Sequence, residues 1–192
     1  MKSFFPRPTQ QAQAWVKSLV SAGDVVVDAT LGNGHDALFL AQLVGPTGKV
    51  FGFDVQAAAL EQSRRLLEND GIEASRFQWL LASHASMSQS ITQPVKAVMF
   101  NLGYLPGADH DCITQTQETL RALSAALELL DEGGILTVIC YPGHLGGDEE
   151  ALAVRDWADA QGDRCEVMIC EKRATKNPAP FLIGLYRKGG DR

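Results

Sequence analysis

Residues 25–36, VVVDATLGNGHD, constrain the fold of this chain more than any other stretch. The valines favour a strand that is covered on both faces of a parallel sheet. Gly32 and Gly34 then allow the backbone to turn sharply and bring its N–H groups close to a ligand. The apolar periodicity of residues 37–44 predicts a helix after this turn. The stretch therefore predicts the first half of a βαβ unit.

The rest of the chain continues this alternation of strands and helices. The expected last two strands follow each other with no helix between them, so we expect the last strand to be antiparallel. Alternating elements predict a mostly parallel sheet with helices on both faces. We therefore expect one α/β domain over residues 1–192, with a seven-stranded sheet. The expected strands are 25–28, 50–53, 76–81, 95–100, 135–140, 165–170 and 181–186, and the expected helices are 9–20 with Thr9 as N-cap, 37–44, 57–69, 114–130 and 151–160.

Composition excludes several classes of protein. The net charge of −6 argues against a protein that coats nucleic acid by neutralising phosphates, but it allows a local basic patch. No apolar run approaches the roughly 20 residues that span a bilayer, and the first residues lack the apolar core of a signal peptide. No pair of cysteines has zinc-ligand spacing. We expect a cytoplasmic protein with no membrane partner and no metal.

Polar or glycine-rich loops follow the expected strands at their carboxyl ends. In open α/β sheets these ends meet at one edge, where ligands bind. The sequence therefore predicts a single site at this edge. The loops that would form it are residues 28–36, Asp54, Ser83-His84, residues 101–106 and residues 141–144.

The glycine turn itself allows three interpretations. Gly32-x-Gly34-x-x-Ala37 fits the loose dinucleotide fingerprint, which would indicate an NAD-dependent oxidoreductase. The wider pattern, Asp28-x-x-x-Gly32-x-Gly34 with Asp54 about 20 residues further on, resembles motif I and the following acid of class I S-adenosylmethionine (SAM) methyltransferases. A tight turn without a ligand is the third interpretation.

Asn101-Leu-Gly-Tyr104 resembles the Asn/Asp-Pro-Pro-Tyr motif of amino-group methyltransferases, with Leu-Gly in place of Pro-Pro. An amine must present its lone pair to the sulfonium methyl group. The Asn101 side-chain oxygen could accept an N–H of that amine and orient it, while Tyr104 packs beside the acceptor. A turn in which Asn101 only caps the strand end is the alternative.

Further candidates lie in the neighbouring loops. Asp109 or His110 could help remove a proton from the amine, and His144 lies in a glycine-rich loop over the site. Each of them could instead be an ordinary loop residue. Cys140, at a strand end, is either a nucleophile that adds to a pyrimidine ring or a buried core residue.

Basic residues gather outside these loops. Arg7 stands in an N-terminal arm with Phe4 and Phe5, and Lys172, Arg173 and Lys176 stand between the last two strands. Local cations beside aromatic residues suit a small folded RNA whose splayed bases can be stacked. A solvated charged rim is the alternative.

Together, DATLGNGHD at 28–36, Ser83-His84, NLGYLPG at 101–107 and YPGHLGG at 141–147 resemble a bacterial family of rRNA-methylase-like proteins. That family includes an enzyme that methylates 5-aminomethyl-2-thiouridine at the tRNA wobble position. The resemblance implies a class I fold, SAM as methyl donor, and the anticodon stem-loop of tRNA as partner. A homodimer would help a protein of this size to span that stem-loop. An rRNA or small-molecule acceptor, or a non-catalytic binding module, would keep the same fold.

The resemblance also assigns roles to residues. Asp28, Gly32, Asn33 and Gly34 would hold the methionine part of SAM, Asp54 the ribose hydroxyls, and Ser83 and His84 the adenine side. Thr30, Asp36 and Val55 are further expected cofactor contacts. The residues expected in catalysis are Asn101, which would also contact SAM, Tyr104, Asp109 and His144. The residues expected in RNA binding are Arg7, Tyr104, His110, Tyr141, His144, Lys172, Arg173 and Lys176.

Overall fold

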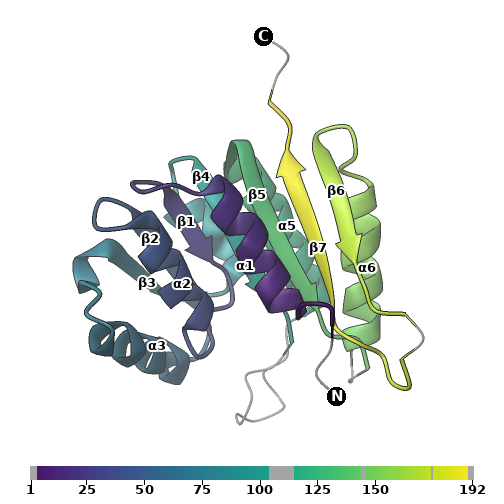
Figure 1. The fold of residues 1–192 in the computed structure, drawn as a ribbon, viewed down its shortest axis with the longest axis horizontal. Helices are drawn as coiled ribbons and strands as arrows, with labels where there is room; N and C mark the ends of the chain where they lie inside the picture. The colour runs from purple at the N-terminus through teal and green to yellow at the C-terminus, as the bar shows by residue number, and fades with distance from the viewer. Residues whose placement is uncertain (1–3, 104–114, 144–145, 174, 190–192) are drawn as a thin grey trace.

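The computed structural model describes residues 4–103, 115–143, 146–173 and 175–189. They form one seven-stranded sheet with helices on both faces (Figure 1). The strands are β1 Val25–Asp28, β2 Lys49–Asp54, β3 Phe77–Leu81, β4 Val95–Asn101, β5 Leu130–Cys140, β6 Cys165–Cys170 and β7 Phe181–Arg187. The helices are α1 Pro8–Leu19, α2 His35–Val44, α3 Ala57–Asn69, α4 Met87–Ser90, α5 Thr116–Leu129 and α6 Gly147–Asp159, with short 3-10 turns η1 Ala74–Arg76 and η2 His84–Ser86.

The strand order is β3-β2-β1-β4-β5-β7-β6, and β7 runs antiparallel to both of its neighbours. This confirms the predicted mostly parallel sheet with an antiparallel last strand. From β1, the next two strands along the chain are added on one side of the sheet. From β4, the remaining strands are added on the other side. The switch point of the sheet therefore lies between β1 and β4, and ligands of open α/β sheets bind at the carboxyl ends of such strands.

Alternate residues of the strands feed two separate cores. Val26, Ala97 and Ile139 point to the face covered by α1, α2 and α3, whereas Val27 and Val98 point to the face covered by α5 and α6. Figure 1 shows α1 and α2 in front of the sheet and α5 behind it. Because both faces are covered, the central strands consist of near-continuous apolar residues.

Helix α1 packs unusually closely on the C-terminal part of the sheet. A Cβ added to Gly184 of β7 would lie 2.5 Å from the Trp15 ring of α1, so only glycine fits at this crossing. The helix begins one residue earlier than expected, because Arg7 rather than Thr9 is its N-cap and Pro8 occupies the first turn. Proline suits that position, since its missing N–H would have no helical partner there.

Other elements also differ from the sequence prediction, and α6 begins at Gly147 rather than at residue 151. Strand β5 begins at Leu130 rather than Ile135, because Leu130 already pairs with Val95 and the register with β4 shifts between Val95 and Ala97. The segment between β3 and β4 holds η2 and α4, where no helix was expected. No helix in the described ranges is long and apolar enough to cross a membrane.

Candidate cofactor and acceptor site

The loops that follow β1, β2 and β4 are joined to one another by backbone hydrogen bonds. The N–H of Ala29 donates to the carbonyl of Met99 over 2.9 Å, and the N–H of Leu31 donates to the carbonyl of Phe53 over 2.9 Å. The predicted convergence of strand ends is therefore observed. This edge of the sheet holds Asp28, Thr30, Gly32, Asn33, Gly34, Asp36, Asp54, Val55, Ser83, His84, Asn101 and Tyr141.

Asp28 is a buried carboxylate with an unfilled bonding position. Its Oδ1 accepts the N–H of Thr30 over 3.2 Å, but its Oδ2 has no hydrogen-bond partner among the described residues. Burial, followed by the negative charge of Asp36, raises the pKa of Asp28 well above its ordinary value, although the N–H groups of Thr30 and Ala37 oppose this. A buried carboxyl group is stabilised by a cation or a hydrogen-bond donor, so this oxygen is a candidate contact for a ligand.

The glycine turn is shaped by contacts with α3. The Gly32 carbonyl accepts a hydrogen bond from Ser63 Oγ over 3.1 Å, and Gly34, the N-cap of α2, has φ +80°. A Cβ on Gly34 would lie 2.8 Å from the Ser63 Cα, which is backbone and cannot rotate away. Gly34 is thus required both by its conformation and by its close approach to α3.

We expect Gly34→Ala to lower the free energy of unfolding by about 2 kcal/mol, because left-handed strain of about 1 kcal/mol adds to a clash with α3. Gly71→Ala is the matched control, since Gly71 has a similar φ of +73° and nothing lies within 4 Å of its added Cβ. Urea unfolding of both variants measures the difference. Equal losses of unfolding free energy in the two variants would show that Ser63 does not exclude a side chain at position 34.

Asp54 links the turn to the end of β2. Its Oδ2 accepts the N–H of Gly32 over 2.9 Å, and its Oδ1 accepts the N–H of Gln56 over 2.9 Å. Val55 beside it is 61% exposed, and Leu81, the residue paired with Asp54 on β3, is 59% exposed. Exposed apolar side chains beside a fixed carboxylate suit a nucleoside, whose ribose is polar and whose base is flat and apolar on its faces.

Ser83 and His84 are tied to neighbouring protein groups. The Ser83 hydroxyl donates to Glu118 of α5 over 3.1 Å. The His84 Nδ1 lies 3.2 Å from the Ala29 carbonyl, and its ring packs edge-on against Phe100. Burial lowers the pKa of His84, so the ring is neutral and braces the loop after β1. Their contact with adenine stays a prediction.

A polar cluster lies at the carboxyl ends of β4 and β5, on the face of the sheet that α1 and α2 cover. The backbone N–H of Asn101 donates to Thr30 Oγ1 over 2.7 Å, and the Tyr141 ring lies close to the end of β4, since a Cβ on Gly103 would lie 3.8 Å from it. Asp36 accepts a hydrogen bond from Gln13 of α1 over 2.8 Å. Burial, and then the charge of Asp36, raises the pKa of the Tyr141 phenol. The cluster joins the predicted cofactor turn to the predicted acceptor motif.

Cys140 supports the core interpretation and not the nucleophile interpretation. Its side chain is buried in the cluster of apolar residues beneath α5 and α6. Burial raises the pKa of its thiol to about 12. A nucleophilic cysteine needs a lowered pKa, because the thiolate is the reactive form.

We expect Cys140 to resist alkylation near neutral pH, since its thiolate forms only as the pH approaches about 12. Iodoacetamide followed by peptide mass mapping should modify the exposed Cys170 and leave Cys140 unmodified. Cys140→Ala should keep enzymatic activity within about twofold of wild type, because a buried thiol takes no part in the chemistry. A loss of activity on alkylation of Cys140 would restore the nucleophile interpretation.

The predicted RNA-binding cations lie at the rim of this edge. Arg7 is the exposed N-cap of α1, and Lys172, Arg173 and Lys176 are exposed in the segment between β6 and β7. That segment touches the loop after β5, since a Cβ on Gly143 would lie 3.2 Å from Pro178.

Glu171 holds part of this rim in place through two arginines. It pairs with Arg155 over 2.5 Å and with Arg173 over 3.0 Å, so part of the charge of Arg173 is neutralised. The other predicted residues, Tyr104, Asp109, His110 and His144, lie outside the described residues.

Three residues of the site escaped sequence reasoning. Gln13, Ser63 and Glu118 lie on helices as ordinary polar positions, and each contacts a site residue at least 23 positions away. Within the part of the chain that the structure describes, no group of three metal-ligating side chains occurs.

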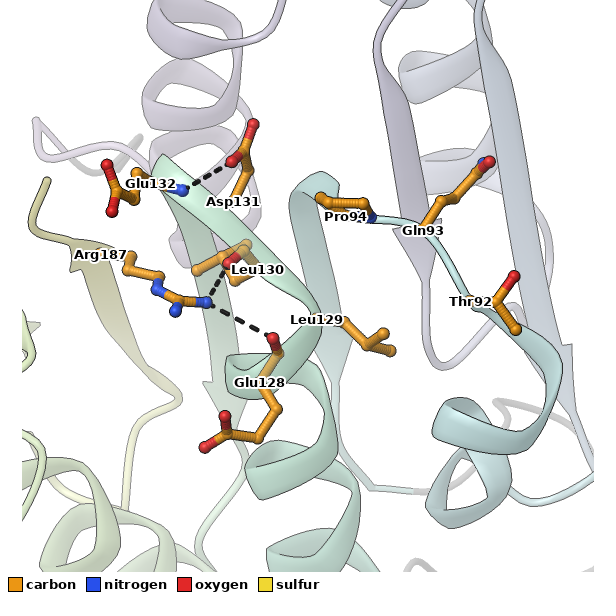
Figure 2. A pocket seen from close by; sticks show the side chains of 9 residues that line it. All are labelled: Thr92, Gln93, Pro94, Glu128, Leu129, Leu130, Asp131, Glu132 and Arg187. Atoms are coloured by element: carbon orange, nitrogen blue, oxygen red, sulfur yellow. Dashed lines mark hydrogen bonds between the residues drawn. The ribbon is translucent and has the colours of Figure 1, made fainter.

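A pocket of about 340 Å³ lies at the opposite end of the sheet, where β5 begins and before β4 starts (Figure 2). Arg187 projects into it and donates to the carbonyls of Leu127, Glu128 and Leu130 at the end of α5. These carbonyls have no helical partner, so the guanidinium caps the helix. The pocket lies where α5 meets β7, at the end of the sheet opposite the candidate site.

Comparison with known proteins agrees with the methyltransferase interpretation of the glycine turn. The model of a family described as "Putative rRNA methylase" matches residues 50–185. A curated relative from Arabidopsis thaliana, "tRNA (mnm(5)s(2)U34)-methyltransferase, chloroplastic", is 31% identical over 95% of this chain and 70% of its own length.

Solved structures give the same result. A Clostridium thermocellum protein described as a putative rRNA-methylase superposes with a TM-score of 0.93, at 39% identity over 96% of this chain and all of its own. A Streptococcus mutans protein described as a putative methyltransferase, in complex with SAH, superposes with a TM-score of 0.87 at 34% identity, over 96% of this chain and 99% of its own. These matches exclude the NAD-dependent oxidoreductase interpretation. The chain belongs to the "Putative rRNA methylase" family of SAM-dependent methyltransferases and has the class I fold.

Proposed function

We propose that this protein transfers the methyl group of SAM to the exocyclic amine of 5-aminomethyl-2-thiouridine at position 34 of tRNA. The product is the 5-methylaminomethyl nucleoside. The observation that carries the proposal is the position of Asn101 at the end of β4. Its backbone N–H donates a hydrogen bond to Thr30 Oγ1 over 2.7 Å, which places it beside the glycine turn. The name of the Arabidopsis relative, which matches nearly the whole chain, supports the choice of acceptor.

On the cofactor side, the unpartnered Oδ2 of Asp28 would receive the ammonium of SAM. Asp54, already fixed by two backbone N–H groups, would accept the ribose hydroxyls through its remaining lone pairs. SAM supplies an activated methyl group, so the protein mainly has to align the two reactants.

On the acceptor side, Asn101 Oδ1 would accept an N–H of the amine and direct its lone pair toward the methyl group. The amine nitrogen gains the methyl carbon as the sulfur releases it, and one N–H proton must leave. A primary amine resembles lysine, with a reference pKa near 10.4, so it must lose a proton before it can attack. Asp109, His110 and His144 are the proposed acceptors of that proton, and Tyr104 would pack against the base.

The exposed cations at the rim are proposed to bind the phosphates of the anticodon stem-loop. They lie beside the loop after β5, which carries Tyr141 into the polar cluster. A basic rim on an acidic protein confines binding to this edge, because phosphates are repelled elsewhere.

We expect Lys176→Ala to raise the KM for tRNA by about threefold and to reduce the salt dependence of binding by about one unit of slope, as for one lost phosphate contact. The KM for SAM should not change. Lys17→Ala is the matched control, since Lys17 is an exposed cation in the last turn of α1, away from the site. Equal effects from both variants would show that the rim does not bind RNA.

The test of the function is methyl transfer from labelled SAM to bulk tRNA from cells that lack this protein, followed by nucleoside mass analysis. Label recovered as 5-methylaminomethyl-2-thiouridine would support donor, acceptor and reacting atom together. If SAM binds and no tRNA is labelled, the tRNA proposal fails. The same assay with rRNA and with small-molecule fractions then identifies the acceptor.

A further inference from the structure

Gln13 connects α1 to the glycine turn, although the two lie far apart in the sequence. Its Nε2 donates to Asp36 Oδ1 over 2.8 Å, and Asp36 stands in the first turn of α2, directly after the glycine turn. Helix α1 is docked by its own apolar side chains, since Ala12 and Val16 are fully buried. Gln13 is half-buried beside that apolar face, so its bond is not needed to hold the helix in place.

The bond orients the Asp36 carboxylate without neutralising it. The donor is a neutral amide, and no Lys or Arg pairs with Asp36 among the described residues. Glu171 at the rim is the contrast, because Arg155 and Arg173 both pair with it. Asp36 is also half-buried, where a charge acts more strongly on its neighbours than it does in water. A fixed carboxylate that no Lys or Arg compensates suits a ligand that brings a cation.

Asp28 brings a second carboxyl group to the same turn. It is buried, and its Oδ2 has no hydrogen-bond partner in the described part of the chain. Burial, and then the charge of Asp36, raises the pKa of Asp28, so the two groups interact. Burial also raises the pKa of Asp36, and the bond from Gln13 opposes this and favours the charged form. Two interacting carboxyl groups of this kind are stabilised when a ligand supplies the missing cation.

The ammonium of SAM is such a cation, and Asp28 is its proposed contact. We propose that Gln13 is a positioning residue for the cofactor, which holds the charged Asp36 carboxylate so that Asp28 and Asp36 bind this ammonium together. Gln13 then acts on the methionine end of the cofactor and not on the adenosine end. The inference rests on the proposed placement of the ammonium and does not depend on the methyl acceptor.

The first test compares two ligands in Gln13→Ala by titration calorimetry. SAH keeps the ammonium, whereas 5′-methylthioadenosine keeps the adenosine and the sulfur but lacks the amino-acid part. We expect the Kd for SAH to rise about five- to tenfold, as for one lost orienting hydrogen bond, and the Kd for 5′-methylthioadenosine to stay within about twofold. An unchanged Kd for SAH, or equal rises for the two ligands, overturns the proposal.

Gln42→Ala is the matched control. Gln42 Nε2 also donates to an aspartate over 2.8 Å, but this bond joins the last turns of α2 to Asp70 at the end of α3. The variant removes the same kind of contact from the same helix, away from the glycine turn, so it should leave the Kd for SAH unchanged. An equal loss of SAH affinity in Gln13→Ala and Gln42→Ala would mean that loosening of α2 is the cause, and it overturns the proposal.

The second test asks whether Gln13 acts through Asp36. Asp36→Asn alone should raise the Kd for SAH about tenfold, because the negative charge beside the ammonium is removed. In that background Gln13→Ala should add less than about twofold, which is a coupling that a double-mutant cycle detects. Losses that simply add would show that Gln13 acts by another route and overturn the proposal.

Asp28→Asn distinguishes failure of this inference from failure of the proposed cofactor contact. If Asp28→Asn weakens SAH binding and Gln13→Ala does not, the contact of Asp28 with the ammonium stands and the role of Gln13 is wrong. If neither variant weakens SAH binding, the placement of the ammonium and the inference both fail. None of these titrations contains RNA, so the identity of the methyl acceptor does not affect them.

Discussion

Asn101→Ala is expected to lower turnover with the tRNA acceptor by about 100-fold or more, while the Kd for SAM stays within about twofold of wild type. The reason is that a displaced or freely turning nucleophile loses the orientation that makes in-line transfer fast. The backbone N–H of Asn101, which donates to Thr30, remains in the variant, so the cofactor turn keeps its anchor.

Single-turnover kinetics with saturating SAM measures this loss, and titration calorimetry measures SAM affinity. Asn101→Asp is the matched control, because it keeps an oxygen acceptor at the same position and should retain most of the activity. Turnover near wild type in Asn101→Ala would remove this side chain from the mechanism. A large loss of SAM affinity would instead place Asn101 on the cofactor side of the site.

Asp54→Ala is expected to have the opposite profile and to weaken SAM binding by about 100-fold or more. Hydrogen bonds to a charged group contribute about 1.5–3 kcal/mol each, and this carboxylate accepts the N–H groups of Gly32 and Gln56. Removing it frees the glycine turn from the end of β2 and also removes the proposed acceptor for the ribose hydroxyls.

Calorimetry with SAM and with SAH checks this prediction. Asp163→Ala serves as the control, since Asp163 is an exposed carboxylate in the turn before β6 and its loss should leave both affinities unchanged. Turnover of Asp54→Ala at saturating SAM should recover to within about tenfold, because the acceptor side remains intact. If SAM affinity is unaffected, the placement of the cofactor along β1 and β2 is wrong.

Much of the site was accessible from the sequence because its signals are local. The glycines, the acid four residues before them and the acid that ends β2 stand on elements that are fixed by short-range apolar patterns. Parallel strands bring their carboxyl ends to one edge, so topology alone placed these residues together. The antiparallel direction of the last strand likewise followed from the missing helix between β6 and β7.

Element boundaries were less accessible, because they depend on pairing between distant segments. Strand β5 begins five residues early only because Leu130 finds a partner in Val95 on β4. No local property of residues 130–134, with their two glycines, indicates a strand.

The sequence by itself determined the class of fold, the edge that carries the site and the identity of its acids and glycines. Tertiary structure alone decided how those groups are held: Gln13 donates to Asp36, Ser63 donates to the Gly32 carbonyl, and the Ser83 hydroxyl donates to Glu118. These contacts join residues whose distance along the chain is set by whole helices and strands. When the partner of a side chain lies far away in the sequence, the neighbouring residues give no signal of the contact. The role of such a side chain can therefore be seen only in the folded structure.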